Sequence, residues 1–150
     1  MVRAAVERVQ AMLPDTSPAD WQDLERVSFG DSPALADALL DLVLSGQKTA
    51  TCWSVEDGQQ TRPGRRSVLC DGSGRPRAVV ETVSLRILSF DRVPAEFARK
   101  EGEGDLSLAY WRQEHRRFFE GLGHYSETMD LWCEEFKVVE VLPTGAGRSS

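Results

Sequence analysis

Lys48 and its neighbours are the first candidates for chemistry. The run G-Q-K-T-A-T at positions 46–51 places an ammonium group close to the hydroxyl groups of Thr49 and Thr51. Lys48 is the only lysine among the first 99 residues of a chain that otherwise uses arginine. A buried lysine can lose its proton and act as a base, whereas an arginine cannot. The run therefore indicates nucleophilic or acid–base chemistry.

A buried lysine needs a carboxylate partner, and Glu81 is the first candidate. Side chains alternate between the two faces of a strand. In the strand expected over residues 77–90, Glu81 therefore lies on the same face as Val79, Val83 and other apolar residues at odd-numbered positions. This pattern directs Glu81 toward the core, where an unpaired charge costs several kcal/mol. We expect Lys48 to be its partner, unless a β-bulge turns Glu81 to solvent.

Three further carboxylates follow in the segment KEGEGD: Glu101, Glu103 and Asp105. A loop of this kind can hold a hard divalent cation. Acidic residues before a helix also cap it and complement its dipole. We favour capping and pocket lining, and so expect neither a metal ion nor another cofactor.

Two aromatic features remain open. His115 lies within an apolar stripe with three- and four-residue spacing, which favours a hydrogen-bonded core histidine over a catalytic one. Trp53 and Trp132 lie on expected strands, where an exposed indole would stack on a nucleic-acid base.

Charge is distributed unevenly. The net charge of −6 argues against indiscriminate binding to phosphate backbones. Residues 61–77, however, contain Arg62, Arg65, Arg66 and two further arginines against one aspartate. This segment is either a phosphate-facing patch or an ordinary solvated loop.

The elements that must position these residues follow from periodicity and capping. We predict helices over residues 2–13, 33–45, 94–100 and 106–121, and strands over residues 49–55, 67–70, 77–90 and 132–142. This order is typical of an α+β domain: a small, mostly antiparallel barrel or strongly curled sheet flanked by helices. The three separated cysteines predict buried free thiols rather than a zinc or disulfide framework.

The 150 residues, 41% of them hydrophobic, are enough for one core. No apolar run is long enough to span a bilayer, and Glu7 and Arg8 interrupt any signal peptide. We therefore expect a cytoplasmic protein without membrane contact. Its protein partners and oligomeric state are not predictable from these features.

The G-x-K-x-x-T pattern of residues 46–51 resembles that of the ASCH (activating signal cointegrator homology) domain, a relative of the PUA-like RNA-binding barrels. Matching segments recur in order between residues 28 and 141, among them Glu81 with Thr82, residues 101–105, and Tyr110 and Trp111 with His115. The resemblance implies a PUA-like β-barrel with an RNA, nucleotide or nucleoside ligand in a cleft beside the motif. It divides the chain into an N-terminal helical appendage (1–27), the ASCH domain (28–142) and a disordered tail (143–150).

The resemblance also implies catalytic roles. Small ASCH proteins similar at Lys48 and Thr51 are amidohydrolases of acetylated cytidine, with a threonine nucleophile and a glutamate whose counterpart here is Glu101. Other members are described as ribonucleases that use a lysine matching Lys48 and a serine matching Ser126, and others only bind RNA. This chain departs from the small amidohydrolases by its N-terminal extension and an insertion around residues 102–128.

We prefer RNA binding with ribonuclease activity, in which Lys48 stabilises charge on phosphorus and a base takes the ribose 2′-hydroxyl proton. The alternative is deacetylation of a nucleoside such as N4-acetylcytidine, in which Thr51 attacks and Lys48, with a lowered pKa, activates it. A non-catalytic RNA-binding module is the third possibility. The residues expected to bind substrate are Thr49, Trp53, Arg62, Arg65, Arg66, Glu81, Glu103, Asp105 and His115.

Overall fold

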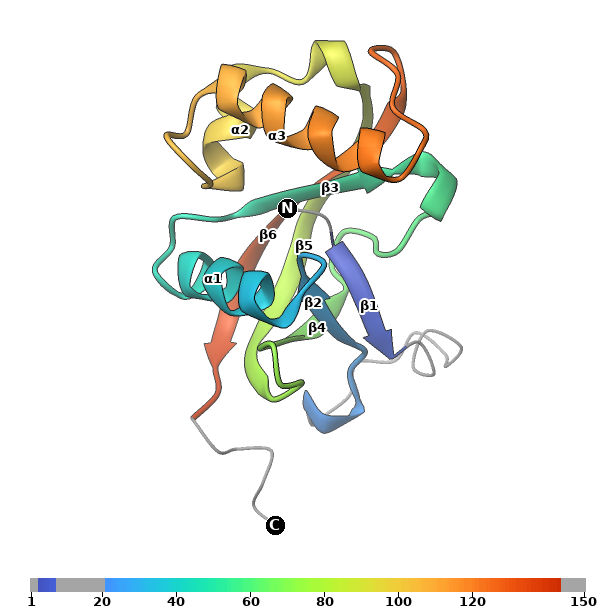
Figure 1. Cartoon of the computed structure of the whole chain (residues 1–150). Coiled ribbons are helices and arrows are strands. Elements are labelled where there is room, and N and C mark those ends of the chain that lie inside the picture. Colours follow the sequence, from blue (N-terminus) through green and yellow to red (C-terminus); the bar gives the residue numbers. More distant parts are fainter. Residues whose placement is uncertain (1–2, 8–20, 144–150) are drawn as a thin grey trace.

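The computed structural model describes residues 3–7 and 21–143, and combines a six-stranded sheet with three α-helices in that part of the chain (Figure 1). The strands are β1 (Arg3–Glu7), β2 (Arg26–Phe29), β3 (Ala50–Ser54), β4 (Arg66–Cys70), β5 (Pro76–Ser89) and β6 (Asp130–Val141). The helices are α1 (Pro33–Leu44), α2 (Ala95–Glu101) and α3 (Leu108–Gly121), with short 3₁₀ helices η2 (Trp21–Asp23), η3 (Val55–Asp57) and η4 (Phe90–Arg92). The expected α+β class is confirmed.

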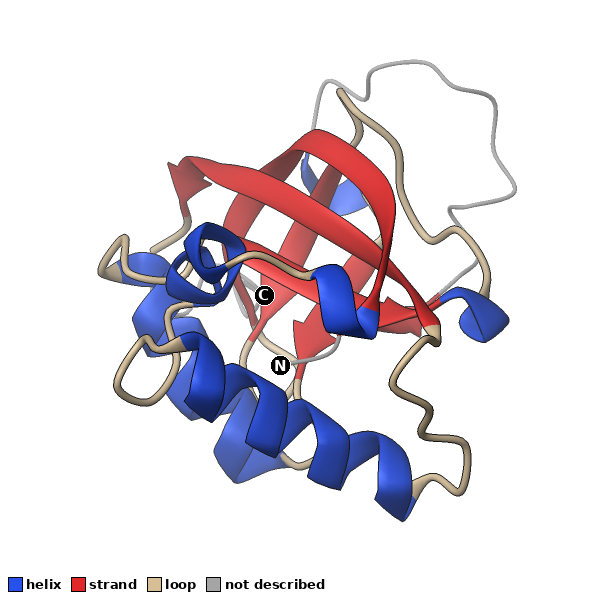
Figure 2. Ribbon diagram, turned by 90° about the horizontal axis from the view of Figure 1, so that it is seen from above, coloured by secondary structure: helices blue, strands red, loops and turns tan. Residues whose placement is uncertain are grey.

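The strands follow the order β1-β2-β4-β5-β6-β3. All neighbours are antiparallel except β2 and β4, which are parallel. Because β1 and β3 are the two edges, the described sheet is open, and the predicted barrel is not confirmed. Figure 2 shows that the strands nevertheless curl strongly, with the long helices to one side.

Two apolar clusters attach the helices to this sheet. Helices α2 and α3 contribute Phe97, Trp111 and Phe119 to a cluster with β3 and β6. Helix α1 contributes Leu39 and Val43, among others, to a second cluster with β2, β4, β5 and β6. In Figure 1 α2 and α3 accordingly lie together beside β3, and α1 lies apart from them. Strand β3 therefore lies between the helix pair and the rest of the sheet.

Helix α1 begins and ends as its sequence predicts. Ser32 is the N-cap, its hydroxyl oxygen accepting from the Leu35 amide at 3.2 Å, and Pro33 follows at the first helical position. Gly46, with φ of +86°, follows the helix end in the left-handed conformation that glycine adopts without strain. The chain can therefore reverse direction and present Lys48 at the start of β3.

The hairpin of β4 and β5 is also confirmed. The Asp71 carboxylate accepts hydrogen bonds from the amides of Ser73 and Arg75 at 2.9 and 3.0 Å, which closes the turn. Register shifts interrupt the pairing of β5 with β6 between Val79 and Val80 and between Thr82 and Ser84. Each bulge changes which side chains face the core. The odd-numbered residues of β5 therefore do not all lie on one face of the sheet.

The N-terminal prediction is wrong where the structure describes it. Residues 3–7 form β1, antiparallel to β2, rather than the first turns of a helix over residues 2–13. Pairing with the exposed edge of β2 satisfies the backbone of this segment, and such tertiary pairing overrides a weak helical pattern. Residues 8–20, and residues 144–150 of the predicted disordered tail (143–150), lie outside the described residues.

None of the helices in the described ranges has the length and apolar character that crossing a lipid bilayer requires.

Candidate functional site

Lys48 lies in the connection between α1 and β3, which docks onto the end of α2. The Lys48 amide donates to Leu42 O at 3.0 Å, and the Thr49 amide donates to Lys100 O at 2.7 Å. The Gln47 side-chain amide donates to Gly102 O at 2.7 Å. Residues 47–49 and 100–102, far apart in the sequence, are therefore held side by side.

Gly102 permits this approach. Its φ is +74°, and a Cβ atom there would lie 2.5 Å from Gln47 O and 2.8 Å from the Lys48 Cα. A larger residue would separate the two segments. Gly102 in KEGEGD thus has a packing role, because it lets the carboxylates on either side of it, Glu101 and Glu103, reach Lys48.

The Lys48 ammonium is surrounded by oxygen atoms. Its Nζ donates to Glu101 Oε1 at 3.0 Å and to Glu103 Oε2 at 3.1 Å, and to Ala50 O and Glu101 O at 2.8 and 3.2 Å. The Phe29 ring lies 5.5 Å from Nζ. The lysine is 0% exposed, Glu101 1% and Glu103 14%, so Glu103 is the member of this Lys48 cluster nearest to solvent.

The two buried charges hold each other ionised. Burial alone lowers the pKa of Lys48, but the charges and hydrogen bonds of Glu101 and Glu103 outweigh it and raise the pKa above its ordinary value. Burial raises the pKa of Glu101, but Lys48 and then His115 outweigh burial and lower it. The expected lowering of the Lys48 pKa is therefore wrong, and the raised pKa opposes the role of a general base.

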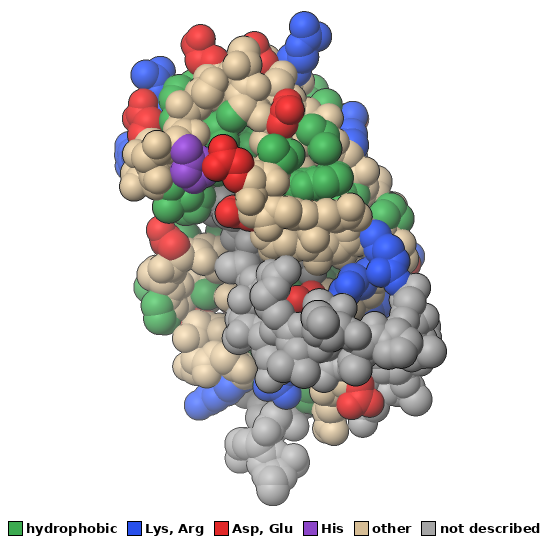
Figure 3. Space-filling model, turned by 90° about the vertical axis from the view of Figure 1, so that its right-hand side faces the viewer, with side chains coloured by type: hydrophobic (Ala, Val, Ile, Leu, Met, Phe, Trp, Pro, Cys, Tyr) green, Lys and Arg blue, Asp and Glu red, His purple; other side chains and the backbone are tan. Residues whose placement is uncertain are grey.

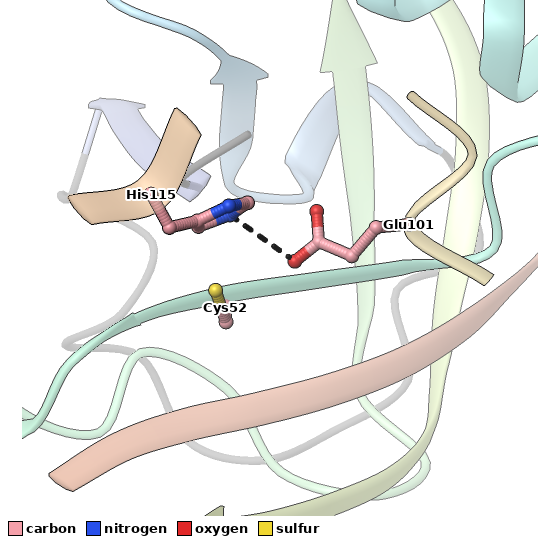
Figure 4. A group of neighbouring side chains, drawn as sticks. All are labelled: Cys52, Glu101 and His115. Atoms are coloured by element: carbon pink, nitrogen blue, oxygen red, sulfur yellow. Dashed lines mark ion pairs between the residues drawn. The ribbon is translucent and has the colours of Figure 1, made fainter. Parts of the chain in front are cut away.

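His115 and Cys52 lie on the other side of Glu101 (Figure 4). His115 Nδ1 is 2.9 Å from Trp111 O, and its ring stacks on the Trp111 ring at 4.2 Å. His115 Nε2 faces Glu101 Oε2 at 3.6 Å. One ligand atom each from Cys52, Glu101 and His115 lie within 4.8 Å of one another, and all three residues are buried. Among the described residues, these three side chains form the group whose ligand atoms are close enough together to hold a metal ion.

The carboxylate loop is not a cation site in the way its sequence suggests. Glu101 and Glu103 point to Lys48, whereas Asp105 is exposed and its carboxylate accepts from the Ser107 amide at 2.9 Å. Asp105 thus helps to form the turn before α3, and Ser107 caps that helix. The three carboxylates therefore do not share one ligand position.

Glu81 is not the partner of Lys48. It lies on β5 opposite Arg66 of β4, and the two side chains form an ion pair of 3.0 Å. Glu81 is 23% exposed, and Val83, which shares its parity, is 52% exposed. The bulges in β5 account for the error, because they turn this parity away from the core.

Trp53 does not offer a stacking surface. The side chain is 0% exposed, and its indole Nε1 donates to Gly58 O at 2.8 Å. Thr51 is also 0% exposed, next to Cys52 on β3 and opposite Glu134 of β6. Strand β3 is buried along its whole length, so these side chains belong to the interior of the domain.

The arginine segment and Ser126 lie at the surface, away from this interior. Arg66 is 55% exposed, and Arg65 pairs with the buried Glu25 at 3.5 Å. Ser126 is exposed in the loop between α3 and β6, where its hydroxyl bonds Thr128. The catalytic residues implied by the resemblance therefore fall into two groups, of which Lys48, Thr51 and Glu101 are interior and Ser126 is not.

Two features of the interior were not predicted from the sequence: the burial of Glu134 and the neighbours of Cys52. Glu134 is 0% exposed and accepts from the Thr82 hydroxyl at 2.7 Å, which in turn bonds Thr61 at 2.7 Å. Cys52 was correctly placed among buried free thiols, but its proximity to Glu101 and His115 was not foreseen. No spacing rule connects residues 52, 101 and 115, since three separate elements bring them together.

Comparison with known proteins agrees with the fold. The family model for the ASCH domain matches residues 25–140. The structure of an ASCH domain from Lactobacillus crispatus JV V101 is 34% identical, with a TM-score of 0.70 over 77% of this chain and 79% of that one. Protein EF3133 from Enterococcus faecalis V583 is 34% identical, with a TM-score of 0.71 over 82% and 80%. No curated protein matches the chain.

Proposed function

The chain belongs to the ASCH domain family, and from this premise we propose that it binds RNA through the arginine segment and hydrolyses RNA phosphodiester bonds. Membership of this family by itself suggests RNA binding. The cytoplasm stays the expected location. Two further proposals go beyond family membership: which residues contact the RNA, and which residue acts as the base in hydrolysis.

The observation that carries the binding proposal is a row of charged side chains across three adjacent strands. The register places Arg66 opposite Glu81, and Glu81 opposite Lys137, on β4, β5 and β6. Arg66 and Lys137 are exposed and flank the single carboxylate between them. Residues 61–77 contain five arginines and one aspartate, so this segment carries a formal charge of +4.

Exposed arginines are suited to phosphate recognition because their planar guanidinium groups donate several hydrogen bonds at once. Figure 3 shows that basic side chains gather on part of the face it presents. The buried Lys48 is not available for this purpose, because oxygen atoms of the protein already accept from its ammonium. We therefore assign the phosphate contacts to the surface arginines rather than to the motif lysine.

Binding is tested with the double variant Arg62→Ala/Arg66→Ala. Arg65 is retained, because its removal would leave the buried Glu25 without its ion pair. The measured quantity is the slope of log K for RNA binding against log salt concentration. For single-stranded RNA each lost phosphate contact makes this slope shallower by about 0.7, so losing two contacts should make it shallower by up to about 1.4. The matched control Arg116→Ala/Arg117→Ala changes the net charge equally on α3. Equal slopes for both variants would contradict the proposal.

For hydrolysis we assign the base to Glu103, the most exposed carboxylate of the Lys48 cluster. Its carboxylate takes the proton of a ribose 2′-hydroxyl, whose oxygen attacks the adjacent phosphorus. The bond from phosphorus to the 5′-oxygen breaks, the leaving oxygen takes a proton from water, and the resulting hydroxide takes the proton back from Glu103. The products are a 2′,3′-cyclic phosphate and a 5′-hydroxyl, and a water molecule then opens the cyclic phosphate to a phosphate monoester, which completes the hydrolysis. Lys48 is then a positioning residue, because its ammonium donates to the Glu103 carboxylate and holds it in place.

Glu103→Gln is the corresponding test. It should lower the rate of RNA cleavage by about 10²–10⁴-fold, which is the usual contribution of a general base, without changing RNA affinity. Glu96→Gln, an exposed neutralisation on α2, is the matched control and should leave the rate unchanged. Ser126→Ala tests the serine implied by the family. RNA binding without any cleavage by the unmodified protein would establish the non-catalytic module instead.

The amidohydrolase alternative is favoured by one specific contact. Lys48 and Glu101, which match the lysine and glutamate of the small amidohydrolases, lie 3.0 Å apart beside the strand that carries Thr51. The raised pKa of Lys48 opposes its role as the base that activates Thr51. Release of acetate from N4-acetylcytidine, abolished by Thr51→Ala, would replace the ribonuclease proposal by this alternative.

A further inference from the structure

We propose that Cys52, Glu101 and His115 form a binding site for a zinc ion between β3, α2 and α3 (Figure 4). This inference does not depend on the proposed function, since it rests on the orientation of three buried side chains. The three residues come from three separate elements and converge on one point in the interior.

The orientation of His115 is the first argument. Its Nδ1 lies 2.9 Å from the Trp111 carbonyl oxygen, which only accepts, so Nδ1 carries a hydrogen. When Nε2 is deprotonated, as it must be in a metal ligand, its lone pair faces Glu101 Oε2. A histidine whose second ring nitrogen donates to a backbone carbonyl is the usual arrangement of a metal-ligating imidazole.

The distance between the two facing atoms is the second argument. Neither His115 Nε2 nor Glu101 Oε2 has a hydrogen-bond partner among the described residues, although both atoms are buried. A proton shared between them would bring them to about 2.7–2.9 Å, yet they are 3.6 Å apart. Two ligands of a tetrahedral zinc ion, each at about 2.0–2.1 Å from it, lie roughly 3.4 Å from one another.

Charge balance is the third argument. Glu101 and Glu103 carry two negative charges against the one positive charge of Lys48, in a region where all three side chains are buried or nearly so. A divalent ion bound with a Cys52 thiolate and a neutral His115 adds one net positive charge, in place of the positive charge by which His115 lowers the pKa of Glu101, and the cluster is then neutral. Glu101 then bridges the two cations, with Oε1 on Lys48 and Oε2 on the metal.

The kinds of donor atom select the metal. A thiolate, an imidazole and a carboxylate together suit zinc, whereas calcium and magnesium require oxygen ligands. Three protein ligands leave one of zinc's four positions for a small exogenous ligand.

Cobalt(II) serves as a spectroscopic probe for this site. The full chain, first treated with a chelator, is titrated with Co²⁺, and we expect one equivalent to bind with a sulfur-to-cobalt charge-transfer band that Zn²⁺ abolishes. Cys52→Ala should lose this band and bind at least about 10²-fold more weakly. Cys70→Ala removes another buried thiol, outside the α2–α3 cluster, and should keep both the band and the affinity.

Stability provides a second readout. Zinc at 100 times its dissociation constant should stabilise the unmodified protein by about 2.7 kcal/mol, and should not stabilise His115→Gln to the same extent. If Cys52→Ala does not fold, X-ray absorption of the unmodified cobalt protein should show one sulfur and two or more nitrogen or oxygen neighbours. Absence of cobalt binding, a first shell without sulfur, or an unchanged band in Cys52→Ala would overturn the proposal.

Discussion

Replacing Lys48 by methionine tests the buried ion pair directly. The substitution keeps the length and apolar stem of the side chain but removes the ammonium, so the Glu101 carboxylate, 1% exposed, loses its main counter-charge. Removing one partner of a buried pair costs about 3–5 kcal/mol because the other charge stays buried. Domains of this size have a stability of about 5–15 kcal/mol, so the loss is a large fraction of the total.

The matched control is Lys100→Met. Lys100 forms an ion pair with Glu135 at the same 3.0 Å, but the two side chains are 37% and 28% exposed. Exposed pairs contribute about 0.2–1 kcal/mol, so this variant should change stability little. The Lys48–Glu101 and Lys100–Glu135 ion pairs have the same length but differ in burial, and Lys48 binds Glu103 in addition. The comparison therefore measures the cost of leaving buried carboxylates without their cation.

The assay is urea unfolding, followed by circular dichroism in the presence of a chelator so that metal binding does not contribute. With a slope of about 2 kcal/mol per molar urea, Lys48→Met should lower the midpoint by about 2 M, and Lys100→Met by less than about 0.5 M. Lys48→Met/Glu101→Gln removes both charges and should recover at least about 2 kcal/mol relative to the sum of the single variants.

Equal midpoints for Lys48→Met and Lys100→Met would refute the reasoning. So would strict additivity in the double variant, because it would show that Lys48 and Glu101 do not interact. If Lys48→Met accumulates only as unfolded protein, Lys48→Met/Glu101→Gln remains informative, since it contains no unpaired Glu101 carboxylate.

Three other substitutions or reagents test neighbouring parts of the structure. Gly102→Ala should destabilise by more than about 2 kcal/mol in the same assay, because φ is +74° and its Cβ would meet Gln47 O, whereas Gly121→Ala, with open space around it, should be neutral or stabilising. Ser107→Ala should cost about 1 kcal/mol by removing the hydroxyl that caps α3, and a loss under about 0.3 kcal/mol would argue against that cap. The Cys133 thiol, whose pKa burial raises to about 12, should resist iodoacetamide at pH 8 in the folded protein and react once it is denatured, as mass spectrometry would show.

Much of the local structure followed from short-range rules. Helix α1 was predictable from Ser32 and Pro33 at its start and Gly46 at its end, because caps and conformational limits act within a few residues. The β4–β5 hairpin was predictable for the same reason, from its turn residues. The G-x-K-x-x-T motif located Lys48, and the resemblance built on that motif and the other matching segments agrees with the family match over residues 25–140.

The partners of Lys48 were decided by tertiary structure. Parity along β5 indicated Glu81, but two bulges shift the register of that strand, and Glu81 pairs with Arg66 instead. Residues 2–13 read as a helix, yet the edge of β2 offers hydrogen bonds that make residues 3–7 a strand. Both errors arise where backbone pairing with a distant segment outweighs a local pattern.

The sequence by itself determined which ionisable groups this domain has and which short elements carry them. Only the tertiary structure decided that Lys48 meets Glu101 and Glu103, and that Cys52 and His115 face the same carboxylate. Protonation and metal affinity depend on distances of a few ångströms inside a region of low polarity. Such distances between residues that are about 50 positions apart arise from packing, and no spacing in the chain encodes them.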